Sequence, residues 1–579
     1  MKHFIQTSIF CLALSVAAVG VGAEPEPPKP EPSAASNVVQ LKVVKWDVSP
    51  PLRDVKVKPK SGTPIKIFRD PTTPPDVEEL PEGWDGKVGT RFSPHVLQKT
   101  SGSRAAIPTP SANVEGLGKG IAGFGLAGVP PDTTGGVGLN YYMQWVNTSF
   151  AFFDKSGGMV DLDGNDWRNG NTIWDGFGGR CEFRNDGDPI VLYDQIAGRW
   201  VMTQFGLSSL GTGPHSQCVA VSTTGDPLGT WNRSEYVWPG NYLNDYPKLS
   251  VWTDGYYLSV NEFQCTASWS CSSAGGAVAV FDRENLIQGI APRAPQYFDL
   301  TYTNILPVDL DGDTEPPPGS PGYFISVKGG VSHFMRIWET FIDWDTPANS
   351  TCGDASNAPS SIVNVTSFNN TNGIDQPDTG ENLDAMSPRA MFRAPYRNLG
   401  DHESILLTHT VGNPGGLRWY EVRDPGGTPV LYQEGTYVPD ADERWMGAVS
   451  MDNGGNIAMG YSVSGAATSP SIRATGRLAS DPLGTMTFSE LEIATGAGHQ
   501  NSYGGRNRWG DYSTMSIDPS DDCTFWYTQE YITTIGSFIW RTRIAAFKFD
   551  ECVPAAPTDF IFSDGFESGN TGGWSNSVP

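Results

Sequence analysis

Basic residues are scarce in this chain of 579 residues, which carries 39 Lys and Arg against 64 Asp and Glu, a formal net charge of −25. A protein of that charge repels phosphate backbones and anionic lipids, and no basic patch interleaved with aromatic residues reverses the repulsion locally. We therefore expect no binding to nucleic acid. Only 18% of the residues are charged, whereas 67 are Gly and 45 are Pro, which is typical of short strands joined by turns and not of a helical protein.

Long apolar segments are also missing, except at the N-terminus. No later stretch approaches about 18 consecutive apolar residues, so we expect no membrane span. At the start of the chain, Lys2 and His3 precede an apolar run over residues 4–21 and small residues that end at Ala23. This order is that of a secretory signal peptide, so residues 1–23 are predicted to be removed by cleavage near Ala23. The mature protein is then secreted or periplasmic.

Cysteines are few, and none has the spacing of a zinc site. Removal of Cys11 with the signal peptide leaves seven of the eight. An exported chain favours disulfides, and proximity in the sequence predicts which cysteines pair. The predicted pairs are Cys181–Cys218, Cys265–Cys271 and Cys523–Cys552, and Cys352 is left over.

The chain divides into regions of different composition. Residues 24–111 are dominated by Pro, Lys, Glu, Val and Thr, which predicts a Pro-rich linker or a loosely docked arm. Residues 112–553 contain short alternating apolar runs separated by Gly, Asn, Asp and Pro, with no sustained helical period, which predicts an all-β region. Residues 554–579 form a C-terminal tail.

The all-β region repeats itself. The turn around Asp226 recurs around Asp481, and 481 − 226 = 255 residues separate the copies. A unit of roughly 60 residues, with a strand, a turn and an aromatic strand, recurs along the region, and such repeats predict a β-propeller because one blade cannot bury its own faces. About seven unit openings are recognised: Asp132, Asp188, Asp245, Tyr323, Asp401, Arg444 and Asp511. We predict seven blades, with six as the nearest alternative; two β-sandwiches are the competing fold.

Four short motifs spread along the all-β region resemble those of a known protein family. Pro-Asp-Thr-Thr-Gly at 131–135, Asn-Asp-Gly-Asp-Pro-Ile at 185–190, Asp-Tyr-Pro-Lys-Leu at 245–249 and Arg-Trp-Gly-Asp-Tyr-Ser at 508–513 resemble signatures of a functionally uncharacterised family of secreted bacterial β-propeller proteins. The resemblance implies the fold and the export, and it carries no established active site. More distantly, the turn at 226–231 is similar to the Asp-box hairpin of sialidase-like propellers, with a spacing that departs by one residue. The segment 560–569 resembles C-terminal tails of other secreted bacterial proteins.

Acidic residues at the unit openings are the candidates for chemistry, because the innermost strands of a propeller line a central funnel. When carboxyl groups cluster, repulsion between their charges raises the pKa of one group above that of another. The protonated group can then act as a general acid and the ionised group as a base or nucleophile, as glycoside hydrolysis requires. The predicted catalytic residues are Asp188, Asp511, Asp245 and His402. In the competing interpretation the Asp side chains cap turns and His402 is a satisfied strand-edge residue.

Two Arg-Trp pairs and one further Asp are the candidates for substrate binding. A guanidinium beside an aromatic plane can stack on sugars or hold a carboxylate. Packing between blades and salt bridges explain the same pairs equally well. The predicted set is Arg444, Trp445, Arg508, Trp509 and Asp132.

Two acidic loops, at 161–166 and 309–313, place carboxylates around a Gly in the way that Ca²⁺ loops begin. The candidate ligands of a structural Ca²⁺ ion are Asp161, Asp163, Asp309, Asp311 and Asp313. The distal Glu of an EF-hand is missing from both loops, so plain acidic turns are the alternative. No other cofactor is expected.

The sequence leaves two functions open. In the first, an exported propeller acts on extracellular carbohydrate or a related polymer, with hydrolysis by paired carboxylates in the funnel. In the second, a non-enzymatic propeller binds a glycan or a protein at the cell surface or outside the cell. We expect a monomer in either case.

Overall fold

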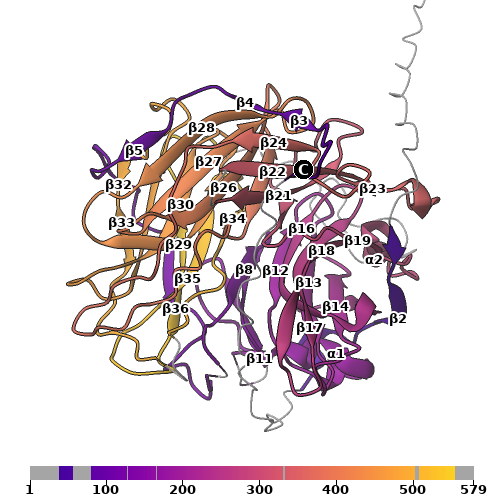
Figure 1. The fold of residues 1–579 in the computed structure, drawn as a ribbon. Coiled ribbons are helices and arrows are strands. Elements are labelled where there is room, and N and C mark those ends of the chain that lie inside the picture. Colours follow the sequence, from indigo (N-terminus) through magenta and orange to yellow (C-terminus); the bar gives the residue numbers. More distant parts are fainter. Residues whose placement is uncertain are drawn as a thin grey trace, which may run out of the picture.

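The computed structural model describes residues 38–56, 80–126, 128–162, 164, 166–329, 333–502 and 507–554. The predicted signal peptide and nearly all of the predicted C-terminal tail lie outside these residues. Within them the regular structure is almost entirely β-strand, with two short α-helices, α1 (Gly179–Phe183) and α2 (Arg283–Gln288). The sheets follow one another around the molecule in sequence order (Figure 1). The protein is a β-propeller, as the sequence predicts.

The described part of the all-β region consists of seven antiparallel meanders. The first contains β8 (Thr133–Val137), β9 (Tyr141–Val146), β10 (Ser149–Asp154) and β11 (Arg168–Asn169). The second contains β12 (Ile190–Asp194), β13 (Arg199–Gly206), β14 (Ser216–Ser222) and β15 (Trp231–Val237). The third contains β16 (Leu243–Val251), β17 (Tyr256–Cys265), β18 (Cys271–Phe281) and β19 (Gln296–Asp299).

The fourth meander contains β20 (Leu306–Leu310), β21 (Gly322–Lys328), β22 (Phe334–Phe341), β23 (Thr351–Cys352) and β24 (Ser361–Asn364). The fifth contains β25 (Ala394–Asn398), β26 (Glu403–Val411), β27 (Gly416–Arg423) and β28 (Val430–Tyr437). The sixth contains β29 (Glu443–Met451), β30 (Ile457–Ser464), β31 (Ser471–Arg477) and β33 (Leu491–Ala494), and β32 (Phe488–Ser489), which precedes β33 in the chain, pairs in parallel with a strand of the N-terminal arm. The last contains β34 (Thr514–Ile517), β35 (Phe525–Tyr531) and β36 (Arg541–Phe547).

The first strands of the meanders form a closed ring. Each contacts the first strand of the next meander, and β34 contacts β8 to complete the circle. The predicted number of blades stays a prediction, because β20 pairs in parallel with β25 and joins two meanders into one 12-stranded sheet. The ring brings the residues just before or within these first strands to one end of the molecule.

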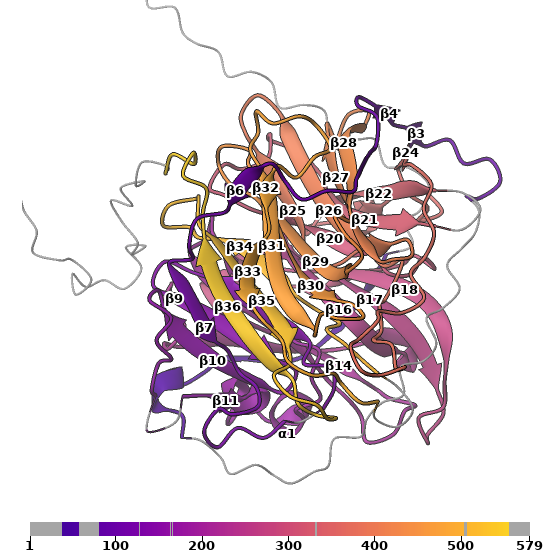
Figure 2. The same cartoon turned by 90° about the vertical axis from the view of Figure 1, so that its left-hand side faces the viewer.

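The N-terminal arm and the first residues after it supply edge strands to most of the sheets. These are β1 (Val39–Gln40), β2 (Lys42–Val48), β3 (Lys87–Val88), β4 (Thr90–Arg91), β5 (Val96–Gln98), β6 (Arg104–Ala106) and β7 (Ala112–Glu115). Strand β2 pairs with β15, and β7 pairs with β36 as the outermost strand of the last meander. Figure 2 shows β7 beside β36, close to the first meander. Because β7 lies shortly before β8 in the chain, this pairing ties the last meander to the first.

Apolar side chains fill the spaces between neighbouring sheets. One cluster combines Val219 and Val221 of β14 with Leu258 of β17 and Ala279 of β18, from the second and third meanders. Sheets covered on both faces require apolar residues at successive positions, as in β18 from Ala277 to Phe281. Twelve tryptophans are fully buried in these layers.

Several turns depend on an Asp side chain. Oδ1 of Asp154 accepts hydrogen bonds from the backbone N–H groups of Ser156 (2.8 Å) and Gly158 (2.9 Å). Asp354 and Asp452 accept in the same way from the residues two and four positions later. An Asp that accepts two backbone hydrogen bonds holds its turn closed. The turn-cap interpretation therefore applies to these residues.

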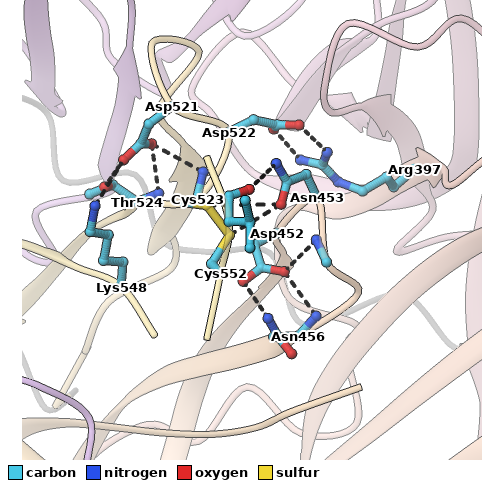
Figure 3. Close-up of a disulfide and its surroundings, with 12 residues drawn as sticks. Arg397, Asp452, Asn453, Asn456, Asp521, Asp522, Cys523, Thr524, Lys548 and Cys552 are labelled. Atoms are coloured by element: carbon cyan, nitrogen blue, oxygen red, sulfur yellow. Dashed lines mark hydrogen bonds and ion pairs between the residues drawn. A yellow bond between two sulfur atoms is a disulfide. The ribbon is translucent and has the colours of Figure 1, made fainter. Parts of the chain in front are cut away.

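The three predicted disulfides are confirmed as Cys181–Cys218, Cys265–Cys271 and Cys523–Cys552. Cys352 is free and buried. The Cys523–Cys552 bridge joins the segment after β36 to the turn between β34 and β35, beside the ion pair of Arg397 with Asp522 (Figure 3). No helix in the described ranges has the length and apolar character needed to cross a membrane.

Candidate functional site

Residues at the openings of four meanders meet at one end of the ring. Asp132, Asp188 and Asp511 lie just before β8, β12 and β34, and Tyr246 lies within β16. All four have left-handed backbone conformations, with φ of 49°, 48°, 60° and 56° in that order. Side-chain-bearing residues rarely adopt this conformation, and such outliers gather where function requires a particular side-chain direction. In β16 the strand register also shifts between Asp245 and Lys248, and such a bulge re-aims the side chains beside it.

The carboxyl groups of Asp132, Asp188 and Asp511 influence one another electrostatically. Burial raises the pKa of Asp188 to about 6, against the opposing effects of a hydrogen bond from Tyr512 and of the charge on Lys248. Burial, together with the charges of Asp188 and Asp511, raises the pKa of Asp132 well above its ordinary value. Two carboxyls of the cluster therefore take up protons more readily than free Asp side chains.

Lys248 is the buried cation of the cluster. Its Nζ lies 3.2 Å from the ring centroid of Tyr246 and 3.7 Å from that of Tyr512, and it donates to the backbone oxygens of Tyr246 (3.3 Å) and Pro247 (3.1 Å). Burial lowers the pKa of Lys248 well below its ordinary value, and the charges of Asp188 and Asp511 oppose this effect only in part. The ammonium group thus links two aromatic rings to the carboxyl groups.

Two arginines complete the cluster. Arg508 forms an ion pair with Asp511, and its Nε lies 3.5 Å from Oδ2 of Asp384. The guanidinium carbon of Arg389 lies 4.9 Å from the ring centroid of Tyr246. Asp384 and Arg389 both belong to the long segment 365–393 between β24 and β25, so this segment borders the cluster.

The three carboxylates of the cluster are not turn caps. Asp188 accepts from the hydroxyl of Tyr512 (2.8 Å), Asp132 accepts from Nδ2 of Asn147 (2.7 Å), and Asp511 accepts from Arg508. Among the described residues none of the three accepts a hydrogen bond from a backbone N–H group, and Oδ1 of both Asp132 and Asp511 is buried with no hydrogen-bond partner.

The other two predicted catalytic residues are Asp245 and His402. Asp245 is half-buried in β16, directly before Tyr246. His402 lies in the turn between β25 and β26, where its Nδ1 is 2.6 Å from Oδ1 of Asp401. That turn is at the far end of β25 from the cluster, so the structure does not bring His402 to the three carboxylates.

Three of the predicted substrate-binding residues are fully buried. Arg444 pairs with Asp440 and Glu490. The rings of Trp445 and Trp509 lie 5.6 Å apart between centroids and have no exposed face for a sugar. Their placement corresponds to the packing and salt-bridge interpretation. Of the predicted set, Arg508 and Asp132 belong to the cluster.

In the acidic loop at 309–313, Asp309 and Asp311 both bind the guanidinium of Arg393, and Asp309 also accepts a hydrogen bond from the backbone N–H of Val251 (2.8 Å). Asp313 is exposed. Calcium at this loop stays a prediction.

In the other acidic loop, Asp161 accepts a hydrogen bond from the backbone N–H of Gly164 (2.5 Å), and Asp163 lies outside the described residues. No group of three or more His, Cys, Asp or Glu side chains in the described ranges could hold a metal ion. Calcium at this loop stays a prediction.

Sequence reasoning missed Lys248, Tyr246, Tyr512 and Arg389 as members of the cluster. The first three stand inside the motifs at 245–249 and 508–513, so the sequence does mark their positions. What it does not mark is that Lys248 and Tyr246 of the third meander contact Tyr512, which lies at the start of the last meander.

No family model and no curated protein matches this chain. Solved structures similar to it include an endo-arabinase from Bacteroides thetaiotaomicron, at 14% identity over 52% of this chain and 95% of that chain, with a TM-score of 0.27. An ulvan lyase, a polysaccharide lyase, is similar at 12% identity over 77% of this chain and 97% of that chain, with a TM-score of 0.29.

A mutant of Trypanosoma rangeli sialidase is similar at 10% identity over 62% of this chain and 53% of that chain, with a TM-score of 0.28. At these identities and TM-scores the similarities carry no argument about function.

Proposed function

We propose that this protein is an exported β-propeller that hydrolyses an extracellular glycan or related polymer, with Asp188 and Asp511 as the paired carboxylates. The observation that carries the proposal is the meeting of three carboxyl groups from separate meanders, none of which caps a turn. The pKa of one of them is about 6, which suits proton transfer near neutral pH.

The two carboxylates take different parts in the reaction. Asp188, protonated below a pKa of about 6, donates its proton to the glycosidic oxygen as the bond between that oxygen and the anomeric carbon breaks. Asp511, paired with Arg508 and with 14% of its side chain exposed, acts from the opposite side of the sugar. It takes a proton from the attacking water in an inverting enzyme or bonds to the anomeric carbon in a retaining one, and the distance between the carboxylates decides which.

The remaining groups support this pair. Asp132 is only 5% exposed and, when protonated, adds no negative charge to the cluster. Lys248 lies beside the carboxyl groups in a position that solvent does not reach and, when protonated, offsets the charge of an ionised carboxylate. The three disulfides suit an oxidising compartment outside the cytoplasm, as the predicted signal peptide requires.

The test begins with the mature protein on a panel of soluble polysaccharides, with release of reducing ends as the readout. On a substrate that is cleaved, Asp188→Asn and Asp511→Asn should each lower the rate about 10²- to 10⁴-fold in folded protein. Asp354→Asn is the matched control, because Asp354 caps a turn outside the cluster and should affect stability without affecting specific activity. Unchanged specific activity in both cluster variants would remove them from the mechanism.

A second function, non-enzymatic binding of a glycan or protein, is favoured by the burial of the cluster, since Asp132 and Lys248 hardly reach solvent. In that case the wild-type protein should bind a member of the panel without releasing reducing ends.

A further inference from the structure

A groove of about 610 Å³ lies away from the carboxylate cluster, on the fifth meander. It is formed where arm strand β5, the end of β28 and the turn between β26 and β27 meet, and residues 367–369 close one side. Its volume falls within the range of roughly 300–1,000 Å³ that is usual for ligand sites.

The groove offers one aromatic ring among polar side chains. Phe368 is half-buried, and the rings of His333 and His409 pack edge-on against it, with centroid distances of 4.8 Å and 4.7 Å, which hold its ring in place. Asn369 and Asn413 line the same groove and are exposed. A fixed ring bordered by amide groups suits a ligand with both an apolar face and many hydroxyl groups, which is the chemistry of a sugar.

One segment of the chain connects the groove to the carboxylate cluster. Segment 365–393 supplies Phe368 and Asn369 to the groove, and it supplies Arg389 to the cluster through the ring of Tyr246. The residue after Arg389 forms a β-bridge with His409, whose ring contacts Phe368. The turn between β26 and β27 also lies at the end of the fifth meander where β25 starts, so groove and cluster share one end of the propeller.

We propose that this groove binds a second stretch of the same glycan chain whose scissile bond lies at the carboxylate cluster. Phe368 stacks on the apolar face of a sugar ring, and Asn369 and Asn413 form hydrogen bonds with its hydroxyl groups. This inference rests on the proposed function and adds to it that the natural substrate is a polymer, long enough to occupy both places.

The test uses the full mature chain and three soluble polymers as probes: arabinan, xylan and polygalacturonate. Affinity electrophoresis identifies the polymer that slows the migration of the wild-type protein. Phe368→Ala should bind this polymer about 2- to 10-fold more weakly than the wild type, the usual worth of an aromatic stacking contact. Asn369→Ala, an exposed change that leaves the packing intact, should weaken it in the same direction. On a substrate too short to reach the groove, the effect on KM should be smaller than on the polymer.

Phe92→Ala is the matched control. Phe92 belongs to the N-terminal arm, is 65% exposed and stacks on Tyr432, but it does not line the groove. If both groove variants bind the polymer as tightly as Phe92→Ala does, the groove proposal is wrong while the proposed function stands. Equal losses on polymer and short substrate would also overturn it, because the variants would then act through the cluster. If the wild type neither binds nor cleaves any of the three polymers, both proposals fail.

Discussion

The pH dependence of stability tests the state of Asp188 directly. The folded protein raises the pKa of this carboxyl from 3.8 to about 6, chiefly by burial, so the fold favours the neutral form. Its contribution to stability is therefore complete below about pH 4 and is lost as the pH rises through about 6. At about 1.4 kcal/mol for each pKa unit, a rise of roughly two units removes about 3 kcal/mol of unfolding free energy by pH 7.5.

Asp188→Asn should abolish this loss, because the amide does not titrate. We expect the unfolding free energy of the wild type to fall by about 2–3 kcal/mol more than that of the variant between pH 4 and pH 7.5, measured by urea denaturation. Buried carboxyls outside the cluster with raised pKa values, such as those of Asp254 and Asp452, are common to both proteins and cancel in the comparison.

Asp154→Asn is the control of opposite sign. Hydrogen bonds from Ser156 and Gly158 lower the pKa of Asp154, so its contribution is present at neutral pH and is lost on acidification. Because the loss occurs below the ordinary pKa of 3.8, this variant should lose about as much stability at pH 4 as at pH 7.5 and should show no fall in unfolding free energy between them of the kind expected for Asp188. Identical pH slopes for the wild type and Asp188→Asn would refute the assignment of Asp188 as the buried titrating group.

Three further outcomes are expected. Tyr512→Phe removes the hydrogen bond that lowers the pKa of Asp188, so on a cleaved substrate the alkaline limb of the pH–rate profile should move to higher pH than in the wild type; an unmoved limb argues against Asp188 as the acid. Arg393→Met leaves two buried carboxylates without their cation and should destabilise the fold by about 3–5 kcal/mol in thermal or urea unfolding, whereas a loss below 1 kcal/mol would contradict the ion-pair network. A thiol reagent without reductant should label no cysteine in the native mature protein and one, Cys352, after denaturation; labelling of any other cysteine would contradict the disulfide set.

The fold class and the disulfides could be predicted because both leave local traces. Alternating apolar runs bounded by Gly, Asn and Asp specify strands and turns one element at a time. Pairing Cys265 with Cys271, only six residues apart, required no knowledge of the fold. Asp132, Asp188 and Asp511 could be selected because each opens a repeated unit, and the ring of first strands brings such openings together.

The sequence by itself determined the strands, the order of the meanders and which acidic residues open them. Only the tertiary structure decided what those residues meet. Lys248 lies between the rings of Tyr246 and Tyr512, although the two tyrosines are far apart in the chain. Likewise the structure buries Trp445 and places Arg393 against the loop that had suggested calcium. Turn and strand preferences act over a few neighbouring residues, whereas these contacts exist only once the ring of sheets has closed, so no local pattern encodes them.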